Sequence, residues 1–184
     1  MGRLFLRPHE TGRQIRECEQ MRTNAIRTDA LGAVLHCLTT ENRLVCLVAL
    51  ETGLRVSDVL RLPSSCLGKT RHTITEAKTG KRKTIRISEK LRAECRKIAG
   101  KTYIFENRLH KDRPRTRQAV WKDMKRAARV LRLKGCAPHS MRKTYARDLR
   151  RRGFTEAAIQ RALNHSSPTI TRLYSLADEV GSAL

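Results

Sequence analysis

The stretch ENRLVCLVALETGLRVSDVLRLP, residues 41–63, decides the fold. Its first part, Glu41 to Leu50, is rich in Leu, Val and Cys, which predicts a helix at the centre of the core. Thr52-Gly53 breaks this helix, and a second helix is predicted from Val56 to Leu62, ended by a proline. Arg55 lies at the corner between the two helices, where its guanidinium can be aimed into a cleft. Taken alone, the pattern favours an ordinary surface arginine after a glycine C-cap.

Helical patterns continue on both sides of this stretch. Upstream, Asp29 can cap a helix with an apolar stripe at Leu31, Val34, Leu35 and Leu38. Downstream, further helices are predicted to begin after a capping or opening residue at Ser88, Thr116, Pro138 and Thr155. A last short helix is expected to lead to Tyr174. The chain is therefore mostly helical.

One segment has the residue pattern of β-strands rather than helices. His72–Thr75 and Lys83–Ser88 are rich in β-branched residues and are separated by Lys78-Thr79-Gly80-Lys81. This pattern predicts a β-hairpin. The fold class is accordingly α+β, mostly α-helical with a small antiparallel sheet. Lys78 lies near the hairpin tip, where a lysine is usually solvated but can also contact phosphates or protonate a leaving oxygen; Lys81 and Lys83 are also available.

Charge dominates the composition. The 184 residues include 40 Lys plus Arg against 17 Asp plus Glu, for a formal net charge of +23 and a pI near 11.0. Such a field attracts polyanions, and nucleic acid is the usual partner. An anionic membrane surface and ribosomal RNA are the alternatives. No apolar run approaches the ~20 residues that span a bilayer, and no signal pattern is present. A soluble, cytoplasmic, nucleoid-associated protein without a membrane partner is expected.

The cysteines do not suggest a metal site. They lie at positions 18, 37, 46, 66, 95 and 136, and no two are spaced as in a zinc knuckle. The histidines do not pair with them at ligand spacing either. Reduced, half-buried thiols in a cytosolic compartment are the favoured interpretation. No metal and no cofactor are expected.

Two segments in the second half of the chain combine histidine with other functional side chains. In PHSMRKTY, residues 138–145, His139 and Arg142 face the same way near a helix start, which favours anions. A phosphate pocket explains this pattern about as well as a core histidine beside a surface arginine. In LNHSS, residues 163–167, His165 lies in a turn nine residues before Tyr174. A tyrosine by itself is most often a packing residue.

Taken together, in this order and spacing, these patterns resemble the catalytic domain of tyrosine recombinases, the phage integrase family. Thr52-Gly53-Leu54-Arg55 resembles the first arginine box, His139-Ser140-Met141-Arg142 the His-x-x-Arg box, and Leu163-Asn164-His165 the Leu-Gly-His box. Tyr174 falls at the position of the nucleophile, and Lys78 at that of the hairpin lysine. Two positions depart from the family pattern: Asn164 replaces the usual glycine, and Lys143 stands where histidine is common.

The resemblance covers about Asp29 to Tyr174 and implies three parts of the chain. These are a basic N-terminal segment at 1–28, a catalytic domain at 29–174, and a short C-terminal tail at 175–184. Full-length members usually carry an N-terminal helical domain that clamps the other face of the DNA. A fragment and a minimal recombinase therefore both remain open.

The resemblance also implies a mechanism on double-stranded DNA. Tyr174 would attack a scissile phosphorus, expel a 5′ hydroxyl and form a 3′-phosphotyrosyl link. Arg55 and Arg142 would stabilise the charge of the phosphorane without a divalent ion.

The remaining site residues would assist this reaction. His165 would add a hydrogen bond to the phosphate. His139 is the candidate base for the tyrosine proton, and Lys78 is the candidate acid for the leaving oxygen. Family members work as tetramers on two duplexes, although a lone catalytic domain can be monomeric in solution.

Three alternatives stay open at this point. Thr155 to Tyr174 has the pattern of a helix-turn-helix, which a non-catalytic transcription factor would use. A type IB topoisomerase would use nearly the same residues to relax supercoils. A domain with intact boxes could also act only within a larger assembly.

Overall fold

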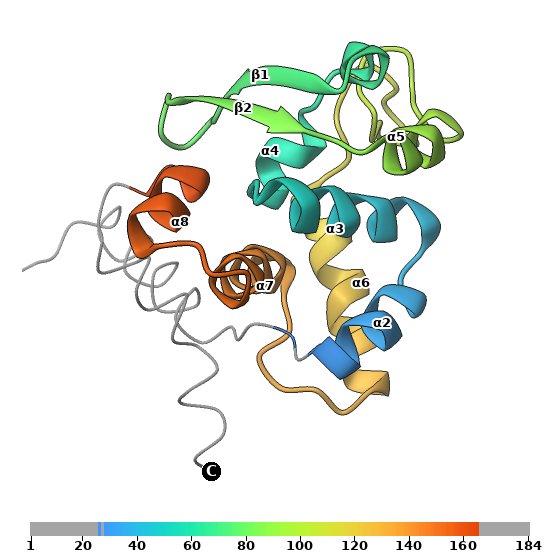
Figure 1. Cartoon of the computed structure of the whole chain (residues 1–184). Helices are drawn as coiled ribbons and strands as arrows, with labels where there is room; N and C mark the ends of the chain where they lie inside the picture. The colour runs from blue at the N-terminus through green and yellow to red at the C-terminus, as the bar shows by residue number, and fades with distance from the viewer. Residues whose placement is uncertain (1–25, 27, 166–184) are drawn as a thin grey trace, which may run out of the picture.

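The computed structural model describes residues 26 and 28–165. In chain order its elements are α2 (Thr28–His36), α3 (Thr40–Thr52), α4 (Val56–Leu60), the 3-10 helix η1 (Ser64–Gly68), β1 (Arg71–Thr75), β2 (Arg82–Arg86), α5 (Glu89–Arg96), α6 (Arg117–Val130), α7 (Pro138–Arg151) and α8 (Glu156–Leu163). Figure 1 shows a helical body with one two-stranded hairpin along its upper edge. The predicted fold class, mostly helical with a small antiparallel sheet, is confirmed.

Helix α3 forms the centre of the core. It contacts α2, α4, α5, α6 and α7, and its apolar side chains are buried on several faces, among them Leu44, Val45, Val48 and Ala49. A helix that is apolar on most sides must be covered on most sides, which explains why its neighbours surround it. The helix ends where Gly53 adopts a left-handed φ of +66°. The predicted central helix and its glycine break are both confirmed.

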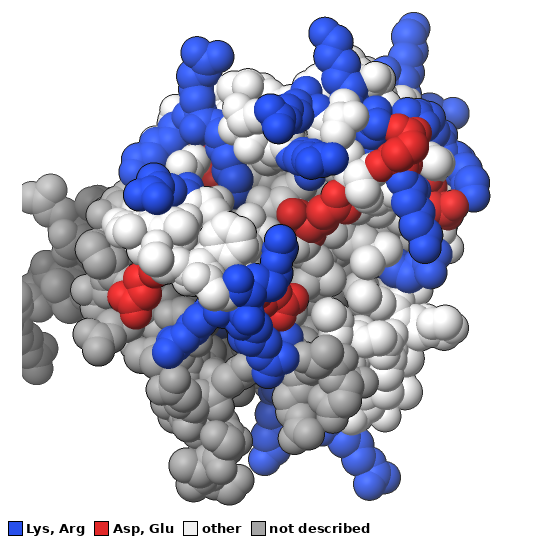
Figure 2. Space-filling model, in the orientation of Figure 1, with Lys and Arg blue, Asp and Glu red and all other residues white. Residues whose placement is uncertain are grey.

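The hairpin formed by β1 and β2 is exposed on one face. The strands are antiparallel with Thr73 opposite Thr84, and exposed residues alternate with more buried ones along both strands. Ile85 points into the core, whereas Arg71, Arg82 and Arg86 are exposed. Figure 2 shows Lys and Arg gathered over the part of the surface that carries the hairpin and α5, with a few acidic side chains between them. This face presents the positive field predicted from composition.

Helices α7 and α8 form a second, smaller cluster, in which Ala146, Leu149, Ile159 and Leu163 are buried. Thr155 caps α8 by accepting a hydrogen bond from the Ala158 N–H at 3.3 Å. Asn164 ends α8 with φ +52°, so the asparagine adopts the left-handed turn that the usual glycine would provide.

Several helix boundaries differ from the sequence-based expectation. Helix α2 ends at His36 and α5 at Arg96, so Leu38 and Ile98 pack against the core from outside these helices. Helix α6 ends at Val130, before the predicted stop at Gly135, because Arg132 already adopts φ +53°. Ser88 precedes α5 but makes no side-chain cap; its hydroxyl bonds instead to the Glu51 carboxylate at 3.0 Å. At the start of α5, a tertiary contact to α3 thus takes the place of the local cap.

The five described cysteines, Cys37, Cys46, Cys66, Cys95 and Cys136, are free, and four of them are fully buried rather than half-buried. Among the described residues, no helix is long and apolar enough to cross a membrane.

Candidate active site

Arg142 joins three separate segments at the centre of the site. It lies on α7 with only 1% of its surface exposed, the largest fully buried side chain of the described residues. Its Nη1 donates to the Gly53 carbonyl at 2.7 Å, and its Nη2 donates to the Leu163 carbonyl. These acceptors are the end of α3 and the end of α8. The guanidinium is therefore fixed in direction by backbone that is itself held in place by packing.

Arg55 lies directly beyond the Gly53 corner, at the first residue before α4. Its Nη1 donates to Glu76 Oε2 at 2.9 Å and lies 4.0 Å from Asp58 Oδ2. One fifth of its side chain remains exposed. Arg55 is thus anchored on one side and open on the other.

Glu76 is a site residue that sequence analysis did not single out. It follows β1, and its carboxylate is completely buried. Besides the bond from Arg55, Oε2 accepts one from the Thr79 hydroxyl at 2.8 Å, and Oε1 lies 3.9 Å from Arg142 Nη1. Burial alone would raise the pKa of this carboxyl, but the hydrogen bonds of Thr79 and Arg55 and the charges of Arg55 and Arg142 hold the pKa below its usual value. A buried anion therefore faces both arginines.

A signal for Glu76 was present in the sequence. It is the single acidic residue between Lys69 and Ser88, in an otherwise basic hairpin. A charge of the opposite sign in such a segment usually has a specific partner, because burying an unpaired carboxylate is costly.

The structure separates the two hairpin lysines. Lys78 is exposed in the turn between β1 and β2. Lys83, on β2, points into the site, where its amine donates to the Thr52 carbonyl at 2.8 Å and lies 6.0 Å from the centre of the Tyr145 ring. Burial, followed by the positive charge of Arg142, lowers the pKa of Lys83 to about 8. The sequence offers Lys83 only as an alternative to Lys78 in the hairpin. In the structure, Lys83 lies close enough to Arg142 and Arg55 for their charges to lower its pKa.

Both predicted histidines lie within the field of the arginines. Burial, and then the charges of Arg142, Lys143 and Arg55, lower the pKa of His139 to about 3. Burial, and then the charges of Arg142 and Arg55, lower the pKa of His165 to about 3 as well. Each imidazole is therefore neutral at neutral pH, and a neutral imidazole has one nitrogen that donates a hydrogen bond and one that accepts a hydrogen bond.

The end of α8 also meets the start of β2 at this site. His165 follows the left-handed Asn164, and its N–H donates to the Gln160 carbonyl at 3.1 Å. Asn164 Nδ2 donates to the Arg82 carbonyl at 3.5 Å. The turn that carries His165 is thereby tied to the hairpin.

The structure thus brings together four of the six predicted site residues, because the charges of Arg55 and Arg142 act on both His139 and His165. Lys78 lies outside this group, at the surface. Tyr174 lies outside the described residues, as do the predicted last helix and the second helix of the helix-turn-helix alternative. Among the described residues, no group of three or more His, Cys, Asp or Glu side chains gathers as metal ligands would.

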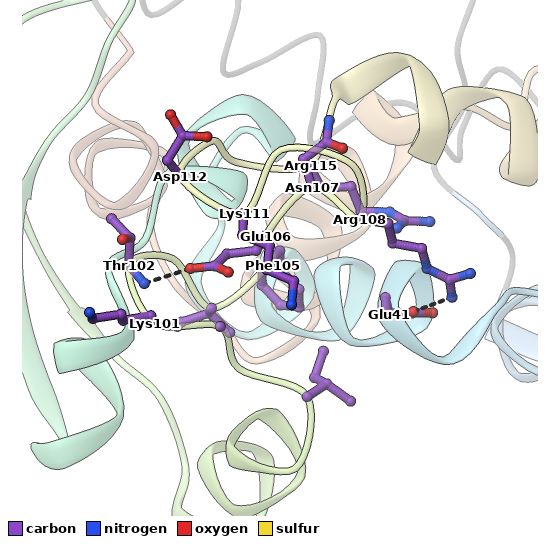
Figure 3. Close-up of a pocket in the computed structure, with 13 residues that line it drawn as sticks. Glu41, Lys101, Thr102, Phe105, Glu106, Asn107, Arg108, Lys111, Asp112 and Arg115 are labelled. Atoms are coloured by element: carbon purple, nitrogen blue, oxygen red, sulfur yellow. Dashed lines mark hydrogen bonds and ion pairs between the residues drawn. The ribbon is translucent and has the colours of Figure 1, made fainter.

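A separate pocket lies beneath the loop that follows α5 and contains none of the predicted site residues (Figure 3). Its rim is tied by an ion pair between Arg108 and Glu41 at 2.5 Å and by a bond from the Thr102 N–H to Glu106 at 2.6 Å. The ion pair attaches the loop to α3, and the bond from Thr102 to Glu106 closes the loop on itself.

Comparison with known proteins decides the family. Residues 10–179 match the family described as "Phage integrase family". This chain belongs to that family.

Curated relatives within the phage integrase family are named integrases and recombinases. The chain is 32% identical over 135 residues to the "Probable integrase/recombinase YoeC" of Bacillus subtilis, a match that covers 71% of this chain and 74% of the relative. It is 30% identical over 142 residues to "Tyrosine recombinase XerA" of Pyrococcus furiosus, covering 73% of this chain and 49% of that protein. The chain therefore spans about half the length of the second relative.

Solved structures of phage integrase relatives share the fold. The crystal structure of XerA recombinase superposes with a TM-score of 0.68 at 17% identity, covering 84% of this chain and 59% of that one. Lambda integrase (residues 75-356) bound to DNA gives a TM-score of 0.71 at 23% identity, covering 89% of this chain and 62% of that one. The family match and the names of the curated relatives do not favour a helix-turn-helix transcription factor or a type IB topoisomerase.

Proposed function

We propose that this chain is the catalytic domain, about 29–174, of a site-specific recombinase that cleaves and rejoins double-stranded DNA in integration, excision or inversion. The observation that carries the proposal is the convergence of Arg55 and Arg142 on one buried carboxylate, in a protein with a formal net charge of +23. Two guanidiniums oriented before the substrate arrives can stabilise a phosphorane without a reorganisation cost during the reaction.

In this mechanism the Tyr174 oxygen forms a bond to the scissile phosphorus, and the bond to the 5′ oxygen breaks. The tyrosine proton passes to His139, whose imidazole is neutral before the reaction; the bound phosphate has to offset the positive charges that lower its pKa. Lys78 donates a proton to the departing 5′ oxygen. The resulting 3′-phosphotyrosyl link keeps the energy needed for rejoining.

The arginines and His165 hold the phosphate during this exchange. The exposed side of Arg55 faces incoming oxygens, while Arg142 contributes its charge from a fixed, buried position. His165 donates a hydrogen bond through its ring. Because two guanidiniums supply the positive charge, the reaction requires no divalent ion.

The basic hairpin face would bind the duplex through phosphates, with a steep dependence on salt. Lambda integrase has been solved as a dimer on a core site and as a tetramer on a Holliday junction. By analogy, the active form of this chain would be a homo-tetramer on two duplexes. It would act inside the cell that holds the DNA.

The decisive experiment is covalent trapping. The protein is incubated with nicked suicide duplexes in EDTA and analysed on a denaturing gel. We expect a protein–DNA adduct that is lost in Tyr174→Phe. Arg55→Ala should abolish the adduct while most DNA binding remains; an equal collapse of binding would contradict the arginine assignment. Absence of adduct on every site tested would favour a DNA reader, and efficient relaxation of an arbitrary supercoiled plasmid would favour a topoisomerase.

A further inference from the structure

Glu76 lies between two parts of the proposed machinery. On one side, Oε2 accepts the hydrogen bond from Arg55 Nη1 at 2.9 Å. On the other side, the same oxygen accepts the hydrogen bond from the Thr79 hydroxyl at 2.8 Å. Oε1 has no hydrogen-bond partner among the described residues. One carboxylate oxygen therefore links the arginine to the hairpin turn.

The turn itself is closed around this link. The Glu76 N–H donates to the Lys81 carbonyl at 3.0 Å, and the Gly80 N–H donates to the Glu76 carbonyl at 2.9 Å. The Thr79 hydroxyl also accepts from the Lys81 N–H at 3.4 Å. Lys78 lies inside this closed turn. Its backbone position is consequently set by the residues that bind Glu76.

A second acid supports the same attachment. Asp58, three residues after Arg55, accepts a hydrogen bond from the Ala77 N–H at 3.0 Å. The turn is thus fastened to the Arg55 corner at two adjacent positions, one on either side of the bond between residues 76 and 77. Of the two carboxylates, Glu76 accepts a hydrogen bond from Arg55 at 2.9 Å, whereas Asp58 Oδ2 lies 4.0 Å from the same guanidinium nitrogen.

We propose that Glu76 is a positioning residue that couples the hairpin turn to Arg55, so that the Lys78 amine reaches the leaving oxygen of the phosphate that Arg55 holds. This inference rests on the proposed function. Arg55 and Thr79 both bind Oε2 of the buried Glu76 carboxylate, which joins the turn to the arginine. Without this coupling, the exposed turn would sample many orientations, and proton transfer needs hydrogen-bond reach. Glu76 contacts neither substrate nor reacting atoms and acts through Lys78 and Arg55.

The chemistry of the leaving group provides the test. In a suicide duplex whose bridging 5′ oxygen is replaced by sulfur, the departing thiolate needs no proton, so a defect in proton donation disappears while a defect in phosphate binding remains. The rate of adduct formation is measured on the oxygen and sulfur duplexes. The variant is Thr79→Val, which removes the hydroxyl bound to Glu76. The matched control is Thr73→Val, which removes an exposed hydroxyl paired with Thr84 at 3.1 Å in the same hairpin.

We expect Thr79→Val to form adduct roughly tenfold more slowly than wild type on the oxygen duplex, the loss that corresponds to one hydrogen bond to a charged group, and at the wild-type rate on the sulfur duplex. Thr73→Val should match wild type on both. Glu76→Gln should lose roughly a hundredfold on oxygen and regain only part of it on sulfur, because Arg55 also loses its charged partner.

The outcomes separate the two levels of the proposal. A wild type that forms no adduct on either duplex overturns the proposed function. The role of Glu76 alone is overturned by a different result. In that case the wild type is active and the sulfur duplex restores Lys78→Ala, but Thr79→Val is either slowed equally on both duplexes or slowed on neither.

Discussion

Arg142 and the hairpin turn around Lys78 are held in different ways. Arg142 is buried and bonded to two backbone carbonyls from helices on either side of it. The turn is exposed and is attached to the body mainly through the side chains of Glu76 and Asp58. The part that binds charge is therefore fixed by the core, whereas the part that would move a proton is held by a few polar contacts. Substitutions should affect stability strongly in the first region and weakly in the second.

The largest effect is expected for Arg142→Ala. It leaves two carbonyls without a donor and reduces the pairing of the buried Glu76, so the free energy of unfolding should fall by about 3–5 kcal/mol. Cleavage should fall by on the order of 10³-fold. Urea denaturation and adduct formation measure the two effects. Arg150→Ala, at an exposed position on the same helix, is the control; an equal loss there would remove the distinction between buried and exposed arginines.

A smaller effect is expected at the glycine corner. In Gly53→Ala the new Cβ would lie 2.4 Å from the Tyr145 ring, at a φ of +66°. The backbone conformation should cost roughly 1–2 kcal/mol, and the overlap with the ring about 1–3 kcal/mol more. Gly153→Ala has a φ of +82° but open space around it, so only the first cost applies. Equal destabilisation of the two variants in urea would contradict the packing argument.

Lowering the pH should destabilise the fold through His139. The pKa of His139 is about 3 in the fold against an ordinary value of 6.5. Below 6.5 the unfolded chain takes up a proton that the folded chain does not. The free energy of unfolding should therefore fall as the pH drops through this window, by at most about 1.4 kcal/mol per pH unit from this group.

The measurement is urea denaturation at a series of pH values between about 7 and 4. His139→Gln should lower the slope, whereas His36→Gln, at the exposed end of α2, should not. If both variants keep the wild-type slope, the neutral state of His139 in the fold is wrong.

The smallest effect on stability is expected at the hairpin turn. Lys78→Ala should change the free energy of unfolding by less than ~0.5 kcal/mol, as for exposed residues in general, yet slow cleavage roughly a hundredfold. Lys83→Met, which loses the bond to the Thr52 carbonyl, should cost about 1 kcal/mol. Restoration of Lys83→Met cleavage, but not that of Lys78→Ala, by a sulfur leaving group would assign proton donation to Lys83.

Features that depend on residues close together in the sequence were predicted, whereas features that depend on residues far apart were not. The α3 helix, the Gly53 break, the hairpin and the Thr155 cap depend on neighbours a few residues apart, and each was predictable from periodicity and turn chemistry. The roles of Lys78 and Tyr174 stay predictions that rest on family register. Glu76 stands out in the sequence only as the single acidic residue of a basic hairpin; its partner Arg55 is 21 residues away, and no local pattern encodes that pairing.

By itself the sequence determined the fold class, the helical order, the basic character and the family, because these depend on local periodicity, total charge and the spacing of short motifs. Only the tertiary structure decided how the site is held. Burial of Arg142 under α3 and α8, the choice of Lys83 rather than Lys78 for the interior, and the placement of a carboxylate between two arginines all arise from packing. Packing brings distant segments within hydrogen-bond reach and removes the water that would otherwise screen their charges.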